Sequence, residues 1–272
     1  MRAGVSFILL VFNLFWVFPA ASFELTRSAA CLQELRALSP GWAPQTDAGP
    51  PELWDFDGQN GAQFYDVDFA ALYQLTGHKS IDEILRTRKA SGKTNHVLDI
   101  FGSGLMVENQ ALADSVTGIR LGPLLRETDD PYTRDLFAQR PPTPPEILGD
   151  ATNPKTWEAL RTSMKERDIP SMDFVAMRPM GGWKQKPFTR TADQNAAAVA
   201  LMVENVLTVL SKEGQFYFSV SVPQAPGDLR DNRILKNLVK RIEAETPYRL
   251  DLIAHQSSIN TTYQLSGVLH PK

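Results

Sequence analysis

The chain is poor in the residues that build covalent or metal frameworks. Among its 272 residues there is one cysteine, Cys31, and only four histidines. A single cysteine excludes an intramolecular disulfide and leaves the redox compartment unassigned. No two histidines have metal-ligand spacing, so we expect no zinc or other metal site. A Ser/His/Asp hydrolase is also disfavoured, because no Gly-x-Ser-x-Gly elbow follows a predicted strand.

A surplus of positive charge is also absent. Lysine and arginine total 28 against 31 acidic residues, which gives a net charge of -3 at pH 7. General nucleic-acid binders normally carry a basic surplus or stripe, so no nucleic-acid partner is expected. The apolar share of 43% and the charged share of 22% are ordinary for a globular protein.

A pronounced apolar run occurs at the N-terminus. Arg2 precedes the apolar residues 5–18, and small residues follow at Ala20 and Ser22. This order predicts a secretory signal peptide over residues 1–22, and therefore a secreted or periplasmic protein. The run is shorter than the roughly 20 residues of a membrane span. An uncleaved anchor, with membrane association through residues 5–18, and a buried N-terminal helix are the alternatives.

Residues 23–95 are predicted to form an N-terminal helical and aromatic cap with a linker. A short helix over 28–39 precedes a Pro/Gly-rich connector from Pro40 to Pro51. Aromatic residues then lead into a helix over 66–75, and their rings either pack on the core or cover a pocket. Ser80 is a predicted N-cap, with Glu83 in the capping-box position.

From His96 to the C-terminus, strand and helix patterns alternate. Such alternation predicts an α/β domain over 96–272, a doubly wound, mostly parallel sheet of seven strands with helices on both faces. The last two strands are joined by a short polar loop, so they form an antiparallel pair at the sheet edge. The predicted strands are 97–101, 115–119, 146–148, 172–177, 215–222, 248–254 and 261–268, and the predicted helices are 106–113, 155–167, 192–210 and 233–244.

The clearest functional motif spans residues 96–104. An apolar run ends in Asp99, and a Gly102-Ser103-Gly104 turn precedes the predicted helix over 106–113. Glycines allow a ligand to approach the backbone, and a helix start offers free N–H groups. A second acidic turn, Gly149-Asp150-Ala151, follows the predicted strand 146–148. Each motif alone is a weak signal, because a tight turn or a helix cap explains it equally well.

Taken in order, the motifs of residues 96–268 resemble those of the class I S-adenosylmethionine-dependent methyltransferases. The resemblance also draws on residues 172–175 and 209–216 and on the aromatic segment 64–73. It implies S-adenosylmethionine as cofactor and methyl transfer as the reaction. The cofactor-binding residues that it implies are Asp99, Phe101, Gly102 and Gly104 for the methionine part, and Asp150 and Ala151 for the adenine.

The chain departs from this family at the end of the second strand. Arg120 stands where the family has an acid that holds the ribose hydroxyls. Guanidinium only donates hydrogen bonds, so that role would fall to Glu127 or Asp129 from the following loop. Three hypotheses remain: a methyltransferase, a methyltransferase-fold scaffold without catalysis, and a nicotinamide-dependent oxidoreductase with Arg120 on a 2′-phosphate. The catalytic residues, the small-molecule or protein acceptor and the oligomeric state are not predicted.

Overall fold

In the computed structural model, the described residues form one sheet and the helices that cover it. The expected signal segment 1–22, the helix 28–39 and the connector 40–51 lie outside the described residues. Within the described part of the chain, no helix is both long and apolar enough to cross a membrane. The described residues are 62–100, 106–107, 109–120, 146–148, 151, 154–178, 192–222, 228–229, 231–256 and 263–272.

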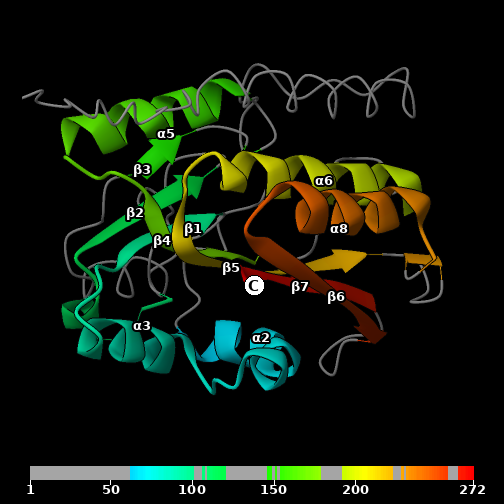
Figure 1. Ribbon diagram of the computed structural model, residues 1–272, viewed down its shortest axis with the longest axis horizontal. Helices are drawn as coiled ribbons and strands as arrows, with labels where there is room; N and C mark the ends of the chain where they lie inside the picture. The colour runs from blue at the N-terminus through cyan, green and yellow to red at the C-terminus, as the bar shows by residue number, and fades with distance from the viewer. Residues whose placement is uncertain are drawn as a thin grey trace, which may run out of the picture.

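Seven strands form one sheet in the order β3-β2-β1-β4-β5-β7-β6 (Figure 1). All neighbours from β3 to β5 pair in parallel, whereas β7 runs antiparallel to both β5 and β6. This arrangement confirms the predicted mostly parallel sheet with an antiparallel pair at one edge. The strands are β1 (His96–Ile100), β2 (Ser115–Arg120), β3 (Glu146–Leu148), β4 (Met172–Met177), β5 (Leu210–Val222), β6 (Tyr248–Gln256) and β7 (Tyr263–Pro271).

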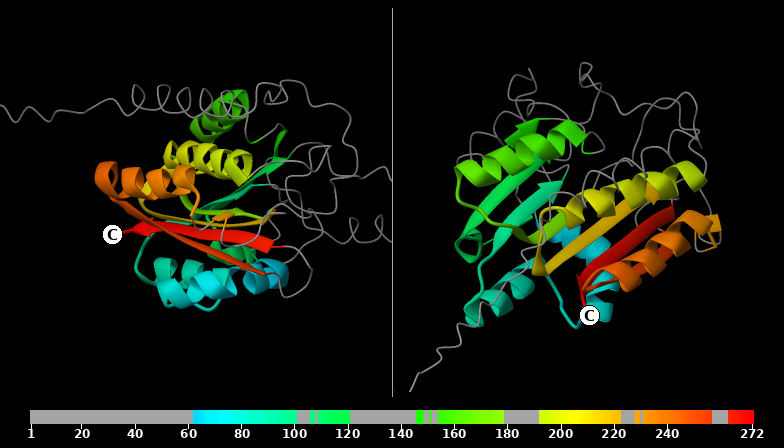
Figure 2. Two further views of the ribbon diagram at one scale, coloured as in Figure 1. Left: turned by 90° about the vertical axis from the view of Figure 1, so that its right-hand side faces the viewer. Right: turned by 45° about the horizontal axis from the view of Figure 1, so that its top comes forward.

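Helices cover both faces of the sheet, as the strand–helix alternation predicts. The helices α2 (Ala62–Thr76) and α3 (Ile81–Ala90) lie on one face (Figures 1 and 2). The other face carries α5 (Pro154–Glu166), α6 (Ala192–Leu207) and α8 (Arg233–Glu245). Two buried clusters follow from this layering, and they are called here the α2-side cluster and the α6-side cluster.

The α2-side cluster is rich in aromatic rings. Rings of α2 pack against Phe174 of β4 and Tyr217 of β5. The ring centroids of Phe174 and Tyr217 lie 5.6 Å from each other. The buried aromatic side chains of α2 therefore pack on the core, one of the two roles considered for the aromatic segment. The aromatic members of this cluster are Tyr65, Phe69, Tyr73, Phe174 and Tyr217.

The cap of α3 follows its sequence prediction closely. The Ser80 side chain accepts a hydrogen bond from the Glu83 amide at 3.1 Å. In return, the Glu83 carboxylate accepts from the amide of Lys79 at 2.6 Å, one residue before the N-cap. The first bond satisfies an amide that a helix start otherwise leaves without a partner, and the second ties the residue before the N-cap to the first turn of α3.

The predicted helix over 106–113 is wrong. The described residues of that stretch contain only a 3-10 turn, η2 (Gln110–Leu112). The Asn109 side chain accepts a hydrogen bond from the Ala111 amide at 3.1 Å, and the Asn109 amide donates to Asp82 of α3 at 3.3 Å. These bonds occupy backbone N–H groups that a helix would use. The stretch therefore forms a turn although its apolar residues are spaced as in a helix.

The predicted end of the long helix is also wrong. Helix α6 stops at Leu207, and β5 already begins at Leu210, the residue at which the predicted helix ends. The amides of Thr208 and Val209 turn back onto the carbonyls of Asn205 and Val206. The Val209 carbonyl then accepts from the Met172 amide at 2.7 Å, which starts the pairing with β4.

Candidate functional site

The central strands β1 and β4 form the switch point of the sheet. The chain runs outward from β1 to β2 and β3 and then returns to place β4 on the other side of β1. In doubly wound sheets, ligands bind outside the carboxyl ends of the strands at this point. Ile100 and Met177, the last residues of β1 and β4, are paired, and Arg178 follows β4 directly. The carboxyl ends of β1 and β4 are therefore the place to look for a site.

Asp99 is the polar residue of β1 at this edge. Successive residues of a strand face opposite sides of a sheet. Leu98 and Ile100 belong to the α6-side cluster, so Asp99 faces α2. Its side chain has no exposed surface, and the hydroxyl of Tyr65 donates to its Oδ1 at 2.8 Å. A buried carboxylate held by a hydrogen-bond donor is a suitable group to receive a cationic part of a ligand.

A buried ion pair lies beside this contact. The Arg178 guanidinium donates from Nε to the carboxylate of Asp68 on α2, and the side chains are only 11% and 8% exposed. The guanidinium carbon of Arg178 also lies 5.9 Å from the ring centroid of Tyr65. Gln264 of β7 donates to the other oxygen of Asp68 at 3.4 Å. Side chains from α2, β1, β4 and β7 thus meet at one edge of the sheet.

His255 extends these contacts toward the edge strand β6. Its Nε2 lies 3.1 Å from Oε1 of Gln264, and the two residues are directly paired across β6 and β7. The Nδ1 atom of His255 is buried and has no hydrogen-bond partner among the described residues.

The sequence-predicted cofactor residues are only partly placed. Phe101, Gly102, Gly104 and Asp150 lie outside the described residues, as do Glu127 and Asp129. Ala151 is fully buried, and its carbonyl accepts the indole N–H of Trp157 on α5 at 2.7 Å. Arg120 is the last residue of β2 and pairs with Leu148 of β3.

Sequence reasoning missed four residues of this site. Tyr65 was placed only within the aromatic segment 64–73, and Asp68, Arg178 and Gln264 were not identified as site residues. A helical spacing of three residues places Tyr65 and Asp68 on the same face of α2, which was the available signal. The partners Arg178 and Gln264 are 110 and 196 positions from Asp68, and no sequence pattern connects them.

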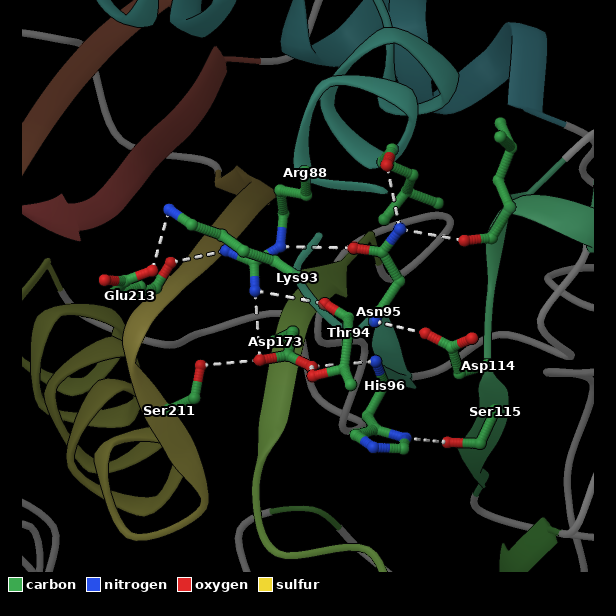
Figure 3. A network of polar contacts seen from close by, with 12 residues as sticks. Arg88, Lys93, Thr94, Asn95, His96, Asp114, Ser115, Asp173, Ser211 and Glu213 are labelled. Carbon is green, nitrogen blue, oxygen red and sulfur yellow. Dashed lines mark hydrogen bonds and ion pairs between the residues drawn. The ribbon is translucent and has the colours of Figure 1, made fainter. Parts of the chain in front are cut away.

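A second polar cluster lies at the opposite, amino edge of the sheet (Figure 3). Its centre is Asp173, the second residue of β4, which is therefore remote from the Arg178 end of the strand. The Asp173 carboxylate pairs with Arg88 of α3 at 3.0 Å. It also accepts hydrogen bonds from Thr94 Oγ1 at 2.9 Å, the His96 amide at 3.0 Å and Ser211 Oγ at 2.8 Å.

The neighbours of this amino-edge cluster are also paired with one another. The side-chain Nδ2 of the buried Asn95 donates to the carbonyls of Leu85 and Leu112, both at 2.8 Å. At the surface, the Lys93 ammonium lies 2.7 Å from Glu213, and this contact lowers the pKa of the Glu213 carboxyl. The contacts join α3 to β1, β4 and β5, so the cluster serves to hold these elements together. No group of histidine, cysteine and acidic side chains able to hold a metal occurs in the described ranges.

The helix α2 carries another polar pair, well separated from Asp99 in sequence. The Tyr73 hydroxyl donates to Asp66 Oδ1 at 2.5 Å, and the same oxygen accepts the Ile81 amide at 3.1 Å. Burial raises the pKa of Asp66, although both hydrogen bonds oppose the shift. This pair ties the end of α2 to the start of α3.

No family model matches the chain, and no curated protein matches it. Solved structures are similar in fold. SMU.776, complexed with SAH, is 12% identical over 69% of this chain and 49% of its own, with a TM-score of 0.42. Human methyltransferase-like protein 13, in complex with SAH, is 13% identical over 64% of this chain and 72% of its own, with a TM-score of 0.39.

A third similar structure is the TehB-like SAM-dependent methyltransferase from Corynebacterium glutamicum. It is 16% identical over 78% of this chain and 98% of its own, with a TM-score of 0.34. The chain spans about half the length of SMU.776, of which 49% is covered. These identities are low, so the function has to be argued from the residues of this chain.

Proposed function

We propose that the protein binds S-adenosylmethionine and transfers its methyl group to an acceptor. The observation that carries the proposal is the buried carboxylate of Asp99 at the end of β1, beside the switch point of a doubly wound sheet. The motif order from residue 96 to residue 268 supports the same function, because it resembles that of the class I methyltransferases.

The residues that would hold the cofactor come from the end of β1 and from the stretches of sequence after β1 and β3, the two strands that flank β2. Asp99 offers a negative charge to the methionine ammonium, and Phe101, Gly102 and Gly104 follow β1 in the sequence. Asp150 and Ala151 follow β3 and are suited to the adenine. The buried Ala151 carbonyl accepts the indole N–H of Trp157, so Ala151 is anchored to α5.

The charges of the described site fit a cationic ligand. Among these described residues, the two acidic side chains of Asp68 and Asp99 outnumber the single guanidinium of Arg178. When bound, the sulfonium of the cofactor supplies the reactive methyl group. The contribution of the protein is then to hold donor and acceptor in line and to exclude water.

Calorimetric titration of the full-length chain with S-adenosylhomocysteine tests the proposal. Asp99→Asn is expected to weaken binding by about 10- to 100-fold, because a hydrogen bond to a charged group is worth about 1.5–3 kcal/mol. Asp168→Asn is the matched control. It removes one exposed carboxylate from the turn after α5, where the positive φ of 54° is tolerated by asparagine.

The outcomes separate the functional hypotheses. Unchanged binding in Asp168→Asn with weakened binding in Asp99→Asn would support the cofactor site. Absence of binding to folded wild-type protein would contradict it and favour the non-catalytic scaffold. The observation that supports the scaffold is Arg120 at the end of β2, where the resembled family has an acid. Titration with NADPH in the same experiment tests the oxidoreductase hypothesis.

We also propose that residues 1–22 direct the chain into the secretory pathway. The support is the sequence pattern of Arg2, the apolar residues 5–18 and the small residues that follow. Mass spectrometry of the chain produced in cells is the test. A mature N-terminus at Phe23 would support signal cleavage, and a membrane-bound chain that retains residues 5–18 would support the anchor instead.

A further inference from the structure

We infer that the buried Asp68–Arg178 ion pair is a positioning device for the cofactor site. Together with Gln264, this pair forms what we call the α2 latch, and it holds the Tyr65 hydroxyl on Asp99. The inference rests on the proposed function, because Asp99 is the residue that the latch serves. Neither Asp68 nor Arg178 needs to touch the cofactor in this role.

The geometry of α2 connects the latch to Asp99. Tyr65 and Asp68 are three residues apart, so they lie on the same face of the helix. Tyr65 is 2% exposed, and its hydroxyl reaches Asp99 Oδ1 at 2.8 Å. Arg178 binds Asp68 and at the same time lies 5.9 Å from the Tyr65 ring centroid. The ring is therefore confined between its helix and a guanidinium that Asp68 holds in place.

Two strands anchor the latch from different sides. Arg178 follows the end of β4, next to β1, whereas Gln264 comes from β7 and reaches the second oxygen of Asp68 at 3.4 Å. Both carboxylate oxygens of Asp68 thus have partners from the sheet. These contacts fix the N-terminal half of α2 against the carboxyl edge, which is the edge where the cofactor is proposed to bind.

A purely stabilising role explains the pair poorly. The free energy needed to remove two charges from water offsets most of their mutual attraction. Apolar residues of similar size therefore often replace such pairs without loss of stability. The α2-side cluster already packs α2 on the sheet through Phe69, Leu72 and Tyr73. The Arg178 guanidinium lies against the Tyr65 ring, and the Tyr65 hydroxyl contacts Asp99. The pair therefore fixes the position of the group that binds Asp99.

The test is calorimetric titration of the full-length chain and its variants with S-adenosylhomocysteine. Tyr65→Phe deletes the hydroxyl and keeps the ring. The pair replacement, Asp68→Asn with Arg178→Met, removes both charges together and so leaves neither one buried alone. We expect Tyr65→Phe to weaken binding by about 10-fold and the pair replacement by a similar or smaller factor.

Combining the changes distinguishes positioning from independent effects. If the latch acts through Tyr65, the triple variant binds no more than about twofold more weakly than Tyr65→Phe alone. The inference would be overturned if the fold-loss of affinity in the triple variant equalled the product of the fold-losses in Tyr65→Phe and in the pair replacement. Tyr73→Phe is the control on the same helix: it breaks the contact with Asp66 and is expected to lower the melting temperature without changing the Kd.

The results also separate this inference from the proposed function. If wild-type protein does not bind S-adenosylhomocysteine, both are overturned. If wild-type protein binds, Asp99→Asn weakens binding, and both Tyr65→Phe and the pair replacement bind like wild type, only the latch is overturned. Tyr65→Phe is nearly isosteric, so it tests the inference even if the pair replacement does not fold.

Discussion

Replacement of Asp173 by alanine is expected to destabilise the fold strongly while leaving ligand binding intact. The change deletes the acceptor shared by Arg88, Thr94, the His96 amide and Ser211 at the amino edge of the sheet (Figure 3). The Arg88 side chain, only 11% exposed, then loses its countercharge. The cluster joins α3 to three central strands, so its loss acts on the whole fold.

The expected loss in the free energy of unfolding depends on the hydrogen bonds that Arg88 keeps. Breaking a buried ion pair costs about 3–5 kcal/mol when one charge is left behind. Arg88 keeps hydrogen bonds to Asn95 Oδ1 at 3.2 Å, the Glu213 carbonyl at 2.7 Å and the Thr94 carbonyl at 3.2 Å. These neutral acceptors compensate in part, so the expected loss in the free energy of unfolding is near the lower end, about 3 kcal/mol.

Urea denaturation of wild-type and Asp173→Ala protein measures this loss. Lys93→Ala is the control, because it breaks the exposed contact with Glu213 and should produce no measurable change. S-adenosylhomocysteine affinity should be the same in Asp173→Ala as in wild type, since Asp99 lies toward the other edge. A destabilisation below about 1 kcal/mol would refute the view that the amino-edge cluster is a principal support of the fold.

Three further changes probe the core. Burial raises the pKa of Tyr217 from 10.0 to about 12, so the folded chain retains a proton that the unfolded chain releases as the pH rises through this window. Stability should therefore fall by about 3 kcal/mol above pH 10, and Tyr217→Phe should remove that part of the fall in urea denaturation measured up to about pH 12. Gly267→Ala should cost about 1–3 kcal/mol, because its Cβ would lie 2.3 Å from Phe218 Cζ; a wild-type denaturation midpoint would contradict this. Trp157→Phe should cost about 1–2 kcal/mol by leaving the buried Ala151 carbonyl without its donor, and unchanged stability would mean that another donor replaces the indole.

The sheet was predictable from sequence because its central strands are buried on both faces. Such strands appear as continuous apolar runs, and the predicted range 172–177 has the same bounds as β4, a central strand in which every residue is buried. The predicted helix over 106–113 shows why helices were harder to predict than strands. The apolar spacing of residues 106–113 suits a helix, but the side chain of Asn109 and the carboxylate of Asp82 bind the backbone there and favour a turn.

The site was only partly predictable for a related reason. Asp99 could be selected because the end of a central strand has a known position in a doubly wound sheet. Its donor Tyr65 is 34 positions away, and nothing in the local sequence distinguishes this tyrosine from the other core aromatics. Asp173 belongs to the segment 172–175 that contributes to the methyltransferase resemblance, and the structure shows that its side chain binds Arg88 at the amino edge.

By itself, the sequence determined the alternation of strands and helices, the mostly parallel sheet and the acid at the end of β1. Local periodicity and strand ends are properties of short segments, so these features can be read without the fold. The tertiary structure alone decided that Asp68, Arg178 and Gln264 meet beside Tyr65. Contacts between such distant positions depend on how helices pack across the sheet, and packing is set by the whole chain at once.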